Sequence, residues 1–173
     1  MGYANHVSCS VLDFCGDRIS HNRYEERNIS YEVSINKAAE QIQEEIAKNG
    51  LSLDKLGGIM ISFDGVVDTI KGIIMVSARH KWERGLEACK DLAEKLPFEA
   101  KISINNSSVL SCSAERAFLD NLKGNIIIIS WDDRTLGCGL LCDGKMASNS
   151  GGIRIYAFYI FQVHKPKTLK CGI

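Results

Sequence analysis

A glycine-containing turn between two apolar stretches is the first feature of the sequence that could do chemistry. The stretch IIIISWDDRTLGCGLLCDGK, residues 126–145, predicts two strands joined by a short turn that contains Gly137 and Gly139, followed by Asp-Gly. Glycines leave backbone N–H groups unhindered, so a turn of this kind can close around phosphate oxygens. The sequence therefore raises the question of whether this turn binds a phosphate.

Two charged residues in the same turn oppose that use. Asp133 would lie where a polyphosphate carries like charge, a repulsion of roughly 1–4 kcal/mol at about 4 Å. Arg134 could hold an anion, but a surface salt bridge to Asp132 or Asp133 is the simpler interpretation, and such bridges contribute little. We expect the turn to be a poor site for a nucleoside triphosphate.

A second group of polar residues lies between predicted elements in the middle of the chain. The residues INNSS place Asn106 and Ser107 between a predicted strand and a predicted helix, and Gly65 lies in the loop DGVVD after another predicted strand. Amide and hydroxyl groups at such positions could hydrogen-bond a polar ligand. Asn and Ser are also the residues that cap helix N-termini and form turns, which is their more common use.

The cysteines do not form a metal-binding pattern. There are 7, at positions 9, 15, 89, 112, 138, 142 and 171, and no Cys-x-x-Cys pair occurs among them. An odd number of scattered thiols is typical of buried small hydrophobic residues in a reducing compartment. Cys138 and Cys142 have no third and fourth ligand nearby, so no metal site is expected there.

Length and charge limit the classes of function. The 173 residues suit one domain, and 21 basic and 21 acidic residues give no net charge that would attract nucleic acid. The longest apolar run, residues 155–161, is far shorter than the roughly 20 residues of a membrane span. The first residues lack the pattern of a signal peptide. We expect a cytoplasmic protein that contacts neither DNA nor membrane.

Hydrophobic spacing predicts three helices. Ile35, Ala39, Ile42 and Ile46 line one face of the first, with Ser34 as N-cap and Gly50 as stop. A second helix ends at Pro97, and a third covers residues 108–122. Strands are predicted around them, at residues 6–14, 18–30, 56–63, 72–78, 99–104, 125–131, 137–142 and 153–163. This order implies an α/β fold with a mixed sheet flanked by helices.

Three segments resemble, in order, the motifs of the ROK family of sugar kinases and sugar-responsive repressors. GIMISFDGVVD resembles the family's Gly-Ile-x-Ile-x-x-Pro-Gly-x-Val-Asp through Gly65 and Asp68, with Asp64 in place of the proline. LAEKLPFEAKISINNSSVLSCSAER resembles its sugar loop, anchored by Glu115. SWDDRTLGCGLLCDGKM resembles its phosphate hairpin, and the resemblance covers roughly residues 3–152.

The resemblance implies an actin-like ATPase (ribonuclease H-like) fold. Residues 1–103 would form the N-terminal lobe, and residues 104–173 the beginning of an incomplete second lobe. Asn106 matches the family's amide that bonds a sugar hydroxyl, with Gly65 and Ser107 beside it. His80 and Trp82 fall where family members place sugar-facing or loop-closing residues, although a Trp beside charged residues is more often a packing residue.

Several positions that carry catalysis in the family's kinases hold other residues in this sequence. The kinase turn is Gly-Thr-Gly-x-Gly-x-Gly, whereas Asp133 and Arg134 occupy its start here. The pattern Asp-x-x-x-Gly-x-Gly that results resembles the version of this turn in the family's repressors. The positions that hold phosphate and Mg²⁺ fall on Tyr3, Ala4 and Asn5, so magnesium would lose a ligand. The general base falls on Ser107, which cannot accept a proton as a carboxylate does. Family members also carry a cysteine-rich zinc cluster. Only the residues KCG, 170–172, match it here, so no zinc is expected.

The resemblance therefore favours a non-catalytic regulatory or effector domain related to the sugar-responsive repressors, with weak or absent carbohydrate binding and no cofactor. The alternative is a ROK sugar kinase that phosphorylates a hexose or an amino sugar with ATP. A third interpretation is an interaction module, because an exposed apolar strand at residues 155–161 could pair with a second copy in a homodimer.

Overall fold

The chain comprises two compact units. The computed structural model describes residues 5–77, 80–118, 124–131, 136–142 and 145–146. The first unit is Met1–Asn106 and the second is Ser107–Ile173. The lobe boundary expected after residue 103 stays a prediction.

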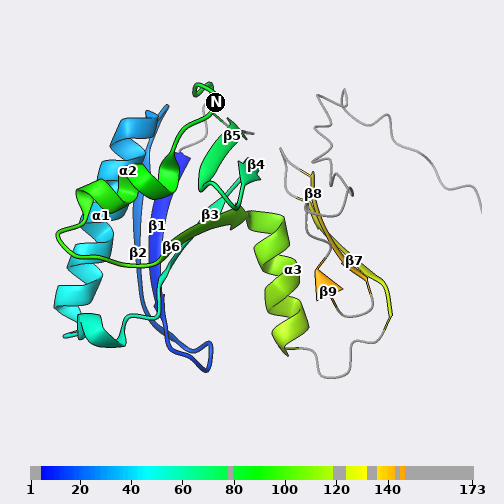
Figure 1. Ribbon diagram of the computed structural model, residues 1–173, viewed down its shortest axis with the longest axis horizontal. Coiled ribbons are helices and arrows are strands. Elements are labelled where there is room, and N and C mark those ends of the chain that lie inside the picture. Colours follow the sequence, from blue (N-terminus) through cyan, green and yellow to red (C-terminus); the bar gives the residue numbers. More distant parts are fainter. Residues whose placement is uncertain (1–4, 78–79, 119–123, 132–135, 143–144, 147–173) are drawn as a thin grey trace, which may run out of the picture. The chain divides into compact units, whose positions relative to one another are not determined.

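The first unit contains two α-helices and six strands within its described residues. In chain order these are β1 (Asn5–Leu12), β2 (Arg18–Glu26), α1 (Tyr31–Lys48), β3 (Ile59–Phe63), β4 (Gly65–Asp68), β5 (Ile73–Ser77), α2 (Ala88–Lys95) and β6 (Ile102–Asn106), with a short 3-10 helix, Leu53–Lys55, after α1 (Figure 1). The strands β1–β2 and β4–β5 form antiparallel pairs, and β3–β6 form a parallel pair. The expected mixed sheet is thus divided into separate pairs.

The second unit contains one helix and three strands within its described residues. Helix α3 (Ser107–Phe118) precedes β7 (Ile126–Trp131), β8 (Leu136–Cys142) and β9 (Lys145–Met146), which form an antiparallel sheet in the order β7-β8-β9. Cys112 of α3 and Leu141 of β8 are almost fully buried in it. The strand predicted at residues 153–163 lies outside the described residues.

Helix α1 begins four residues before the start that the sequence predicted. The predicted N-cap, Ser34, was wrong: Ser30 is the N-cap, and its Oγ accepts a hydrogen bond of 3.2 Å from the N–H of Val33. Ser34 lies inside the first turns, where its hydroxyl donates to the carbonyl oxygen of Ser30 at 2.8 Å. Ser30 precedes a polar first turn with an acidic residue, Glu32, which favours the positive end of the helix dipole.

Removal of the Ser30 hydroxyl should therefore destabilise α1. We expect Ser30→Ala to lower the free energy of unfolding by about 1 kcal/mol, because a backbone N–H of the first turn loses its acceptor. Urea denaturation followed by circular dichroism measures this change. Ser34→Ala is the matched control and should have the smaller effect; the reverse order would restore Ser34 as the cap.

Four residues of the segment DGVVD, Gly65–Asp68, form the strand β4 and not the loop that was predicted. Gly65 pairs with Ser77 and Asp68 with Ile73, so β4 and β5 form a hairpin. Val66 and Val67 are β-branched, which suits a strand. Asp68 closes the connecting turn, because its Oδ1 accepts the N–H groups of Ile70 and Lys71 at 3.1 and 3.0 Å. Local side-chain bonding of this kind is what favours Asp in turns.

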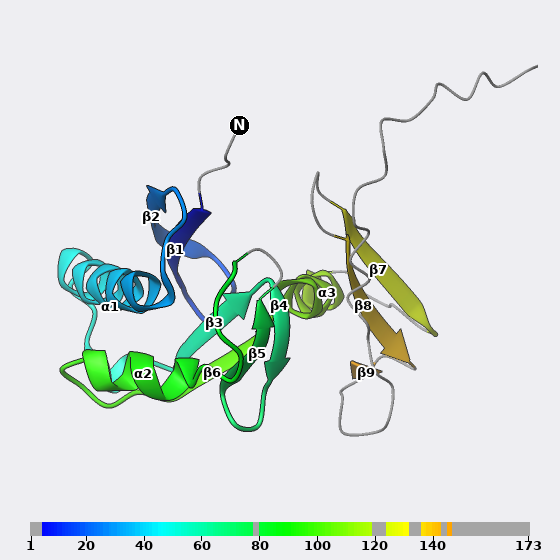
Figure 2. The ribbon, with the colours of Figure 1, turned by 90° about the horizontal axis from the view of Figure 1, so that it is seen from above.

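Helices α1 and α2 cover one side of the β3–β6 pair (Figure 2). One core cluster joins the two helices through Ala39, Leu92 and Leu96, and Ile59 and Ile61 of β3 pack against it. A second cluster lies toward β4 and β5, and its buried members are Ile35, Val67, Ile74, Ala88 and Ile104. No helix within the described residues is both long and apolar enough to cross a membrane.

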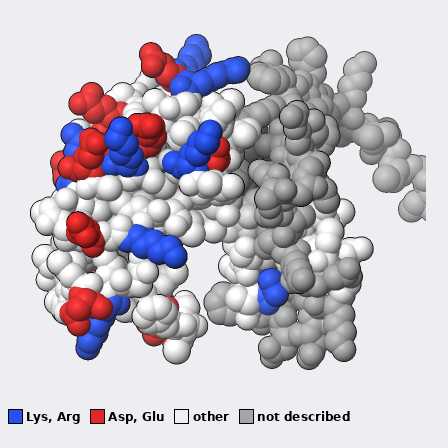
Figure 3. All heavy atoms as spheres, in the orientation of Figure 1, with Lys and Arg blue, Asp and Glu red and all other residues white. Residues whose placement is uncertain are grey.

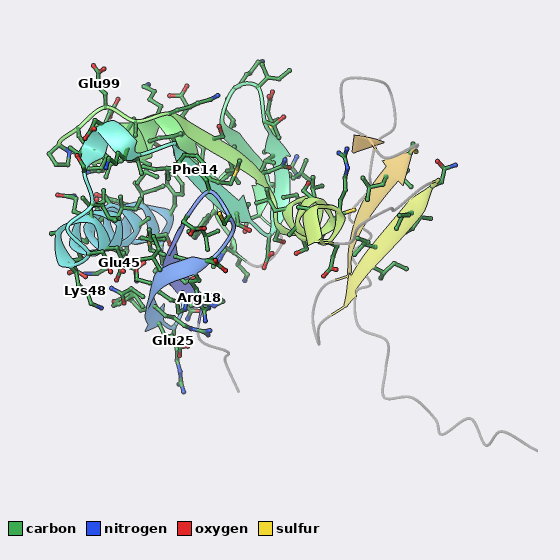
Figure 4. The ribbon with its side chains drawn as sticks, turned by 90° about the horizontal axis from the view of Figure 1, so that it is seen from below. Phe14, Arg18, Glu25, Glu45, Lys48 and Glu99 are labelled. Atoms are coloured by element: carbon green, nitrogen blue, oxygen red, sulfur yellow. The ribbon has the colours of Figure 1, made fainter. Side chains whose placement is uncertain are left out.

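Helix α1 also buries two polar side chains on the side that packs against the β1–β2 hairpin. Gln41 is 4% exposed and Glu45 is 1% exposed. Figure 4 labels Glu45 on α1, and Glu25 on the hairpin. The Nε2 of Gln41 donates to the carbonyl oxygen of Val7 at 3.4 Å, whereas its Oε1 has no partner among the described residues. Such a buried acceptor costs roughly 1–3 kcal/mol.

Charged side chains are mixed in sign on the surface of the first unit. On the face that Figure 3 shows, acidic and basic side chains are interspersed. Two of the ion pairs join neighbouring turns of a helix, Lys37 to Glu40 and Lys90 to Glu87. Exposed pairs of this kind contribute little to stability.

Candidate functional site

The parallel strands β3 and β6 end at the same edge. Their register runs from Ile59 opposite Ile102 to Phe63 opposite Asn106, so the two carboxyl ends lie side by side. Ligands of α/β proteins commonly bind beyond the carboxyl ends of parallel strands. The residues at and after these two ends therefore form the candidate site, and they include Gly65 and Asn106.

The structure brings Gly65 and Asn106 into direct contact. The Nδ2 of Asn106 donates a hydrogen bond of 2.7 Å to the carbonyl oxygen of Gly65. The backbone N–H of Asn106 is also held, by the Oδ1 of Asn105 at 2.8 Å. Asn106 is partly buried, and these two bonds orient its amide relative to the start of β4. The two residues that the sequence singled out are thus neighbours across two elements.

Gly65 occupies a place that no larger residue fits. A Cβ atom built on Gly65 would lie 2.3 Å from the carbonyl oxygen of Val76 and 2.7 Å from Cε1 of Phe63. Contacts this short do not occur in proteins, so the backbone of β5 or the Phe63 ring would have to move. The glycine allows β4 to approach both groups, and this approach holds the carbonyl oxygen that Asn106 contacts.

Ser107 is the first residue of α3 and follows Asn106 directly in the chain. Its carbonyl oxygen accepts a hydrogen bond of 3.0 Å from the hydroxyl of Ser111. Ser107 belongs to the second compact unit, whereas Asn106 and Gly65 belong to the first. Its assignment to a ligand site stays a prediction.

An aromatic group packs beside the carboxyl end of β3. The ring of Trp82 stacks on Phe63 at 5.8 Å between centroids and on His80 at 4.1 Å, and it meets Tyr31 edge-on at 5.5 Å. Its indole N–H donates to the carbonyl oxygen of Ile29 at 3.1 Å. Trp82 packs against the core cluster, so its interpretation as a packing residue is confirmed. His80 covers the ring on one side.

Sequence reasoning missed the part that Phe63 and Tyr31 play in this aromatic group. Phe63 was assigned only to a buried strand, and Tyr31 only to the chain before the first helix. The available signal was positional: Phe63 is the last residue of its strand, directly before the candidate loop. Ligand sites are lined largely by hydrophobic and aromatic side chains.

Tyr31 fixes the start of α1 to α2. Its hydroxyl donates to Oδ2 of Asp91 at 2.5 Å. Burial, followed by this hydrogen bond and the charge of Asp91, raises the pKa of Tyr31 above its usual value of 10.0. The phenol therefore keeps its proton in the folded chain at pH values where the unfolded chain loses it.

Because the pKa of Tyr31 is raised in the folded chain, the stability that this residue contributes should fall at alkaline pH. The contribution of Tyr31 is fully present below pH 10.0 and is lost as the pH rises further, because the unfolded state releases its proton first. We expect Tyr31→Phe to cost about 1 kcal/mol at neutral pH and to reduce the loss of stability above pH 10. Thermal melts from pH 7 to pH 11 measure both.

Tyr24→Phe is the control for this prediction. The hydroxyl of Tyr24 also donates to a carboxylate, Glu26, at 2.6 Å, but this bond lies within one strand of the β1–β2 hairpin and joins no two elements. Its replacement should change the melting temperature little at any pH. Equal effects of the two substitutions would contradict the importance assigned to the Tyr31–Asp91 bond.

The phosphate-like turn is described only in part. Asp133 and Arg134 lie outside the described residues, as does the proposed salt bridge of Arg134. Gly137 and Gly139 lie in β8, opposite Ser130 and Ile128 of β7. The sequence predicted a strand over residues 137–142, and β8 begins one residue earlier, at Leu136.

Gly139 has a packing reason to be glycine. A Cβ atom built on it would lie 2.4 Å from the Cβ of Cys112 and 3.1 Å from the carbonyl oxygen of Ser108. The glycine therefore lets β8 approach α3 closely within the second unit. Glycine at this position does not by itself indicate a phosphate site.

The positions expected to have lost the magnesium ligand and the general base are only partly visible. Tyr3 and Ala4 lie outside the described residues, and Asn5 is the first residue of β1. In the described part of the chain, no group of three or more His, Cys, Asp or Glu side chains could hold a metal ion. The expected loss of kinase chemistry stays a prediction.

Solved structures of ROK proteins resemble this chain in fold. No protein-family model matches the sequence, and no curated protein sequence matches it. A ROK family transcriptional regulator, described as a homolog of the E. coli MLC protein, superposes with a TM-score of 0.68 at 17% identity, over 83% of this chain and 36% of that one. The chain has the fold of the ROK proteins. This is the actin-like ATPase type of α/β fold that the sequence resemblance implied.

Two ROK kinases have the same fold. A ROK family glucokinase from Streptomyces griseus, in complex with glucose and AMPPNP, gives a TM-score of 0.64 at 16% identity over 89% of this chain. A ROK hexokinase from Thermus thermophilus gives 0.61 at 13% identity over 82% of this chain. The chain spans 51% and 48% of these two proteins. The ROK fold is thus shared with both a regulator and kinases.

Proposed function

We propose that this chain is a non-catalytic regulatory domain of ROK type that acts in the cytoplasm and binds a carbohydrate weakly through Asn106, Gly65 and Ser107. In this proposal residues 1–103 form the N-terminal lobe and residues 104–173 begin the second. The chain makes no DNA contact itself, and its turn at Asp133, Arg134, Gly137 and Gly139 no longer holds ATP. The free cysteines in the described part of the chain are in keeping with a reducing compartment.

The observation that carries the proposal is the bond between Asn106 and Gly65. It orients a side-chain amide, which has both donors and an acceptor, at the shared carboxyl end of two parallel strands. Sugar hydroxyls need groups that both donate and accept. An amide already fixed in position loses less conformational entropy on binding than a mobile one.

The chemistry of two residues favours regulation over phosphoryl transfer. Ser107 cannot draw a proton from a sugar hydroxyl as a carboxylate would, and general-base catalysis contributes about 10²–10⁴-fold in rate. Asp133 would repel the phosphates of a nucleotide. Binding of a sugar does not need either a base or a phosphate cradle.

A sugar-binding experiment tests the proposal. Glucose, mannose and N-acetylglucosamine are titrated into the protein while its melting temperature is followed. Saturation at a hundredfold excess over the dissociation constant should stabilise the fold by about 2.7 kcal/mol. Asn106→Asp keeps the side-chain shape but removes the N–H donors, and it should abolish the shift.

Ser62→Ala is the control, because Ser62 is an exposed residue of β3 outside the candidate site. It should leave the sugar-induced shift unchanged. No shift with any of the three sugars would contradict carbohydrate binding by this chain.

A coupled assay for ADP release distinguishes the regulator from a sugar kinase. The regulator should release no ADP above the buffer rate when ATP, Mg²⁺ and each sugar are present together. Turnover that depends on sugar would establish the kinase interpretation and overturn this one.

A further inference from the structure

Strand β2 has one edge without a partner strand in the described part of the chain. Among the described strands β2 pairs with β1 alone, and β1 lies on the side of β2 that faces β3 (Figure 2). Such an edge presents backbone N–H and C=O groups that another strand can bind. A two-stranded hairpin is only marginally stable by itself, so an added strand stabilises it. The open edge of β2 is therefore a surface suited to an extended chain.

The part of β2 from Ser20 to Glu26 is regular. Its residues pair one to one with those of β1 from Val11 back to Asn5, and the register shift of the hairpin lies beyond them. The stretch contains no proline, no glycine and no lysine. Proteins commonly use proline, bulges and lysine to keep edge strands from pairing with other chains. None of these features protects this stretch.

Two opposite charges lie on the outward face of the same stretch. The side chains of β2 alternate between exposed and half-buried, and Arg23 and Glu25 are both exposed. The Nε of Arg23 lies 2.7 Å from Oε1 of Glu25, and each side chain is 50% exposed. A neighbouring strand with the reverse order of charges would extend this ion pair into a network, and networks stabilise more than isolated exposed pairs.

The inward face of the stretch is held by helix α1. The hydroxyl of Tyr24 donates to Oε2 of Glu26 at 2.6 Å, and the Nζ of Lys37 lies 5.2 Å from the centre of the Tyr24 ring. The Nδ2 of Asn22 donates to Oε2 of Glu44 at 3.2 Å. These contacts fix the strand on the helix, so its edge loses little conformational entropy when it pairs.

The five residues from Asn22 to Glu26 are complementary to a second copy of themselves. In an antiparallel pair with a twofold axis at Tyr24, Arg23 of each copy lies opposite Glu25 of the other. The amide of Asn22 lies opposite the carboxylate of Glu26, and the two Tyr24 rings lie opposite each other. Opposite charges and aromatic pairs directly across two strands are favourable. A second copy therefore fits the edge at all of these positions.

The neighbouring registers lack this fit. An axis at Arg23 or at Glu25 would set like charges opposite each other, and an axis at Asn22 would set Arg23 opposite His21. An axis between two residues would set exposed side chains opposite half-buried ones, because side chains alternate between the faces of a strand. The charges therefore select one register.

We propose that β2 is the interface of a homodimer of this protein, in which the β2 strands of two copies pair edge to edge and antiparallel about Tyr24. The β1–β2 sheets of the two copies then form one continuous sheet. Each Arg23 contacts the Glu25 of the other copy, so the charges alternate in sign along and across the outward face. This interface goes beyond the proposed function, which needs only one copy.

Charge reversal tests the interface. In a homodimer, Arg23→Glu sets acidic side chains opposite each other, and Glu25→Arg does the same with basic ones. We expect each variant to raise the dissociation constant of the dimer at least about tenfold, measured by sedimentation equilibrium at concentrations up to about 1 mM. Arg84→Glu is the matched control, because Arg84 is an exposed residue outside β2. It should leave the dissociation constant unchanged.

A mixture of the two variants separates contact between copies from an effect within one chain. When Arg23→Glu and Glu25→Arg proteins pair with each other, every acidic side chain again lies opposite a basic one. Association should therefore return in the mixture, although each variant alone associates weakly. Loss of the ion pair within a chain predicts no such recovery. A monomeric unsubstituted protein, a dimer that Arg23→Glu leaves intact, or a mixture that does not associate would each overturn the proposal.

Discussion

Replacement of Leu92 by alanine should lower the free energy of unfolding by about 2–5 kcal/mol. Leu92 is 2% exposed and joins α1, α2, β3 and β6 in one core cluster. The substitution removes buried methyl groups and leaves a cavity between elements that cannot all close on it. Urea denaturation of the purified chain, with the slope of the transition compared with that of the unsubstituted protein, measures the change.

Leu53→Ala is the matched control for this prediction. Leu53 lies in the 3-10 helix after α1 and is 48% exposed. The same chemical change there should cost much less, because little apolar surface is buried. Similar losses at the two positions would show that the core between α1 and α2 is not packed as described.

Replacement of Gly65 by alanine should destabilise the first unit and disturb the candidate site together. The added methyl would meet the backbone oxygen of Val76, which cannot rotate away as a side chain can. Overpacking of this kind typically costs about 1–3 kcal/mol. Because β4 must shift, the bond from Asn106 to the Gly65 carbonyl should lengthen or break. Thermal melts with and without sugar measure both effects.

Gly57→Ala is the control. A Cβ at this position would meet only the far end of the Phe14 side chain, which is 92% exposed and can swing away. Its melting temperature should therefore stay close to that of the unsubstituted protein. A Gly65→Ala protein with unchanged stability would contradict the close approach of β4 and β5.

The helices and most strands could be predicted from the spacing of apolar residues. Ile35 and Ala39 recur at the period of a helix, and both are buried in α1. Leu92 lies on the buried face of α2, and Pro97 follows the last turn as expected. These signals are local and periodic, so tertiary contacts do not need to be known to detect them.

Helix starts and short strands were harder to predict. Ser30 and Ser34 are the same residue type one turn apart, and only the backbone geometry distinguishes the cap from the interior residue. The pairing of β4 with β5 depends on the hairpin as a whole, so the two valines in DGVVD were too short a signal. The choice in both cases depends on contacts beyond the local pattern.

The sequence indicated residues of the candidate site but not the contacts between them. The sequence indicated Gly65 and Asn106, and the resemblance placed them in neighbouring loops. The hydrogen bond between them depends on the register of β3 and β6, which sequence spacing does not determine. The burial of Gln41 and Glu45 was also missed, because polar residues on a helix are ordinarily exposed.

The parallel pairing of β3 with β6 has a consequence for how the chain folds. The two strands are separated in sequence by β4, β5 and α2, whereas β1, β2 and α1 follow one another directly. Contacts between distant segments form slowly, because a long loop must close before they are gained. The hairpin with its helix should thus organise early during synthesis, and the edge that carries Asn106 should be among the last parts of the first unit to assemble.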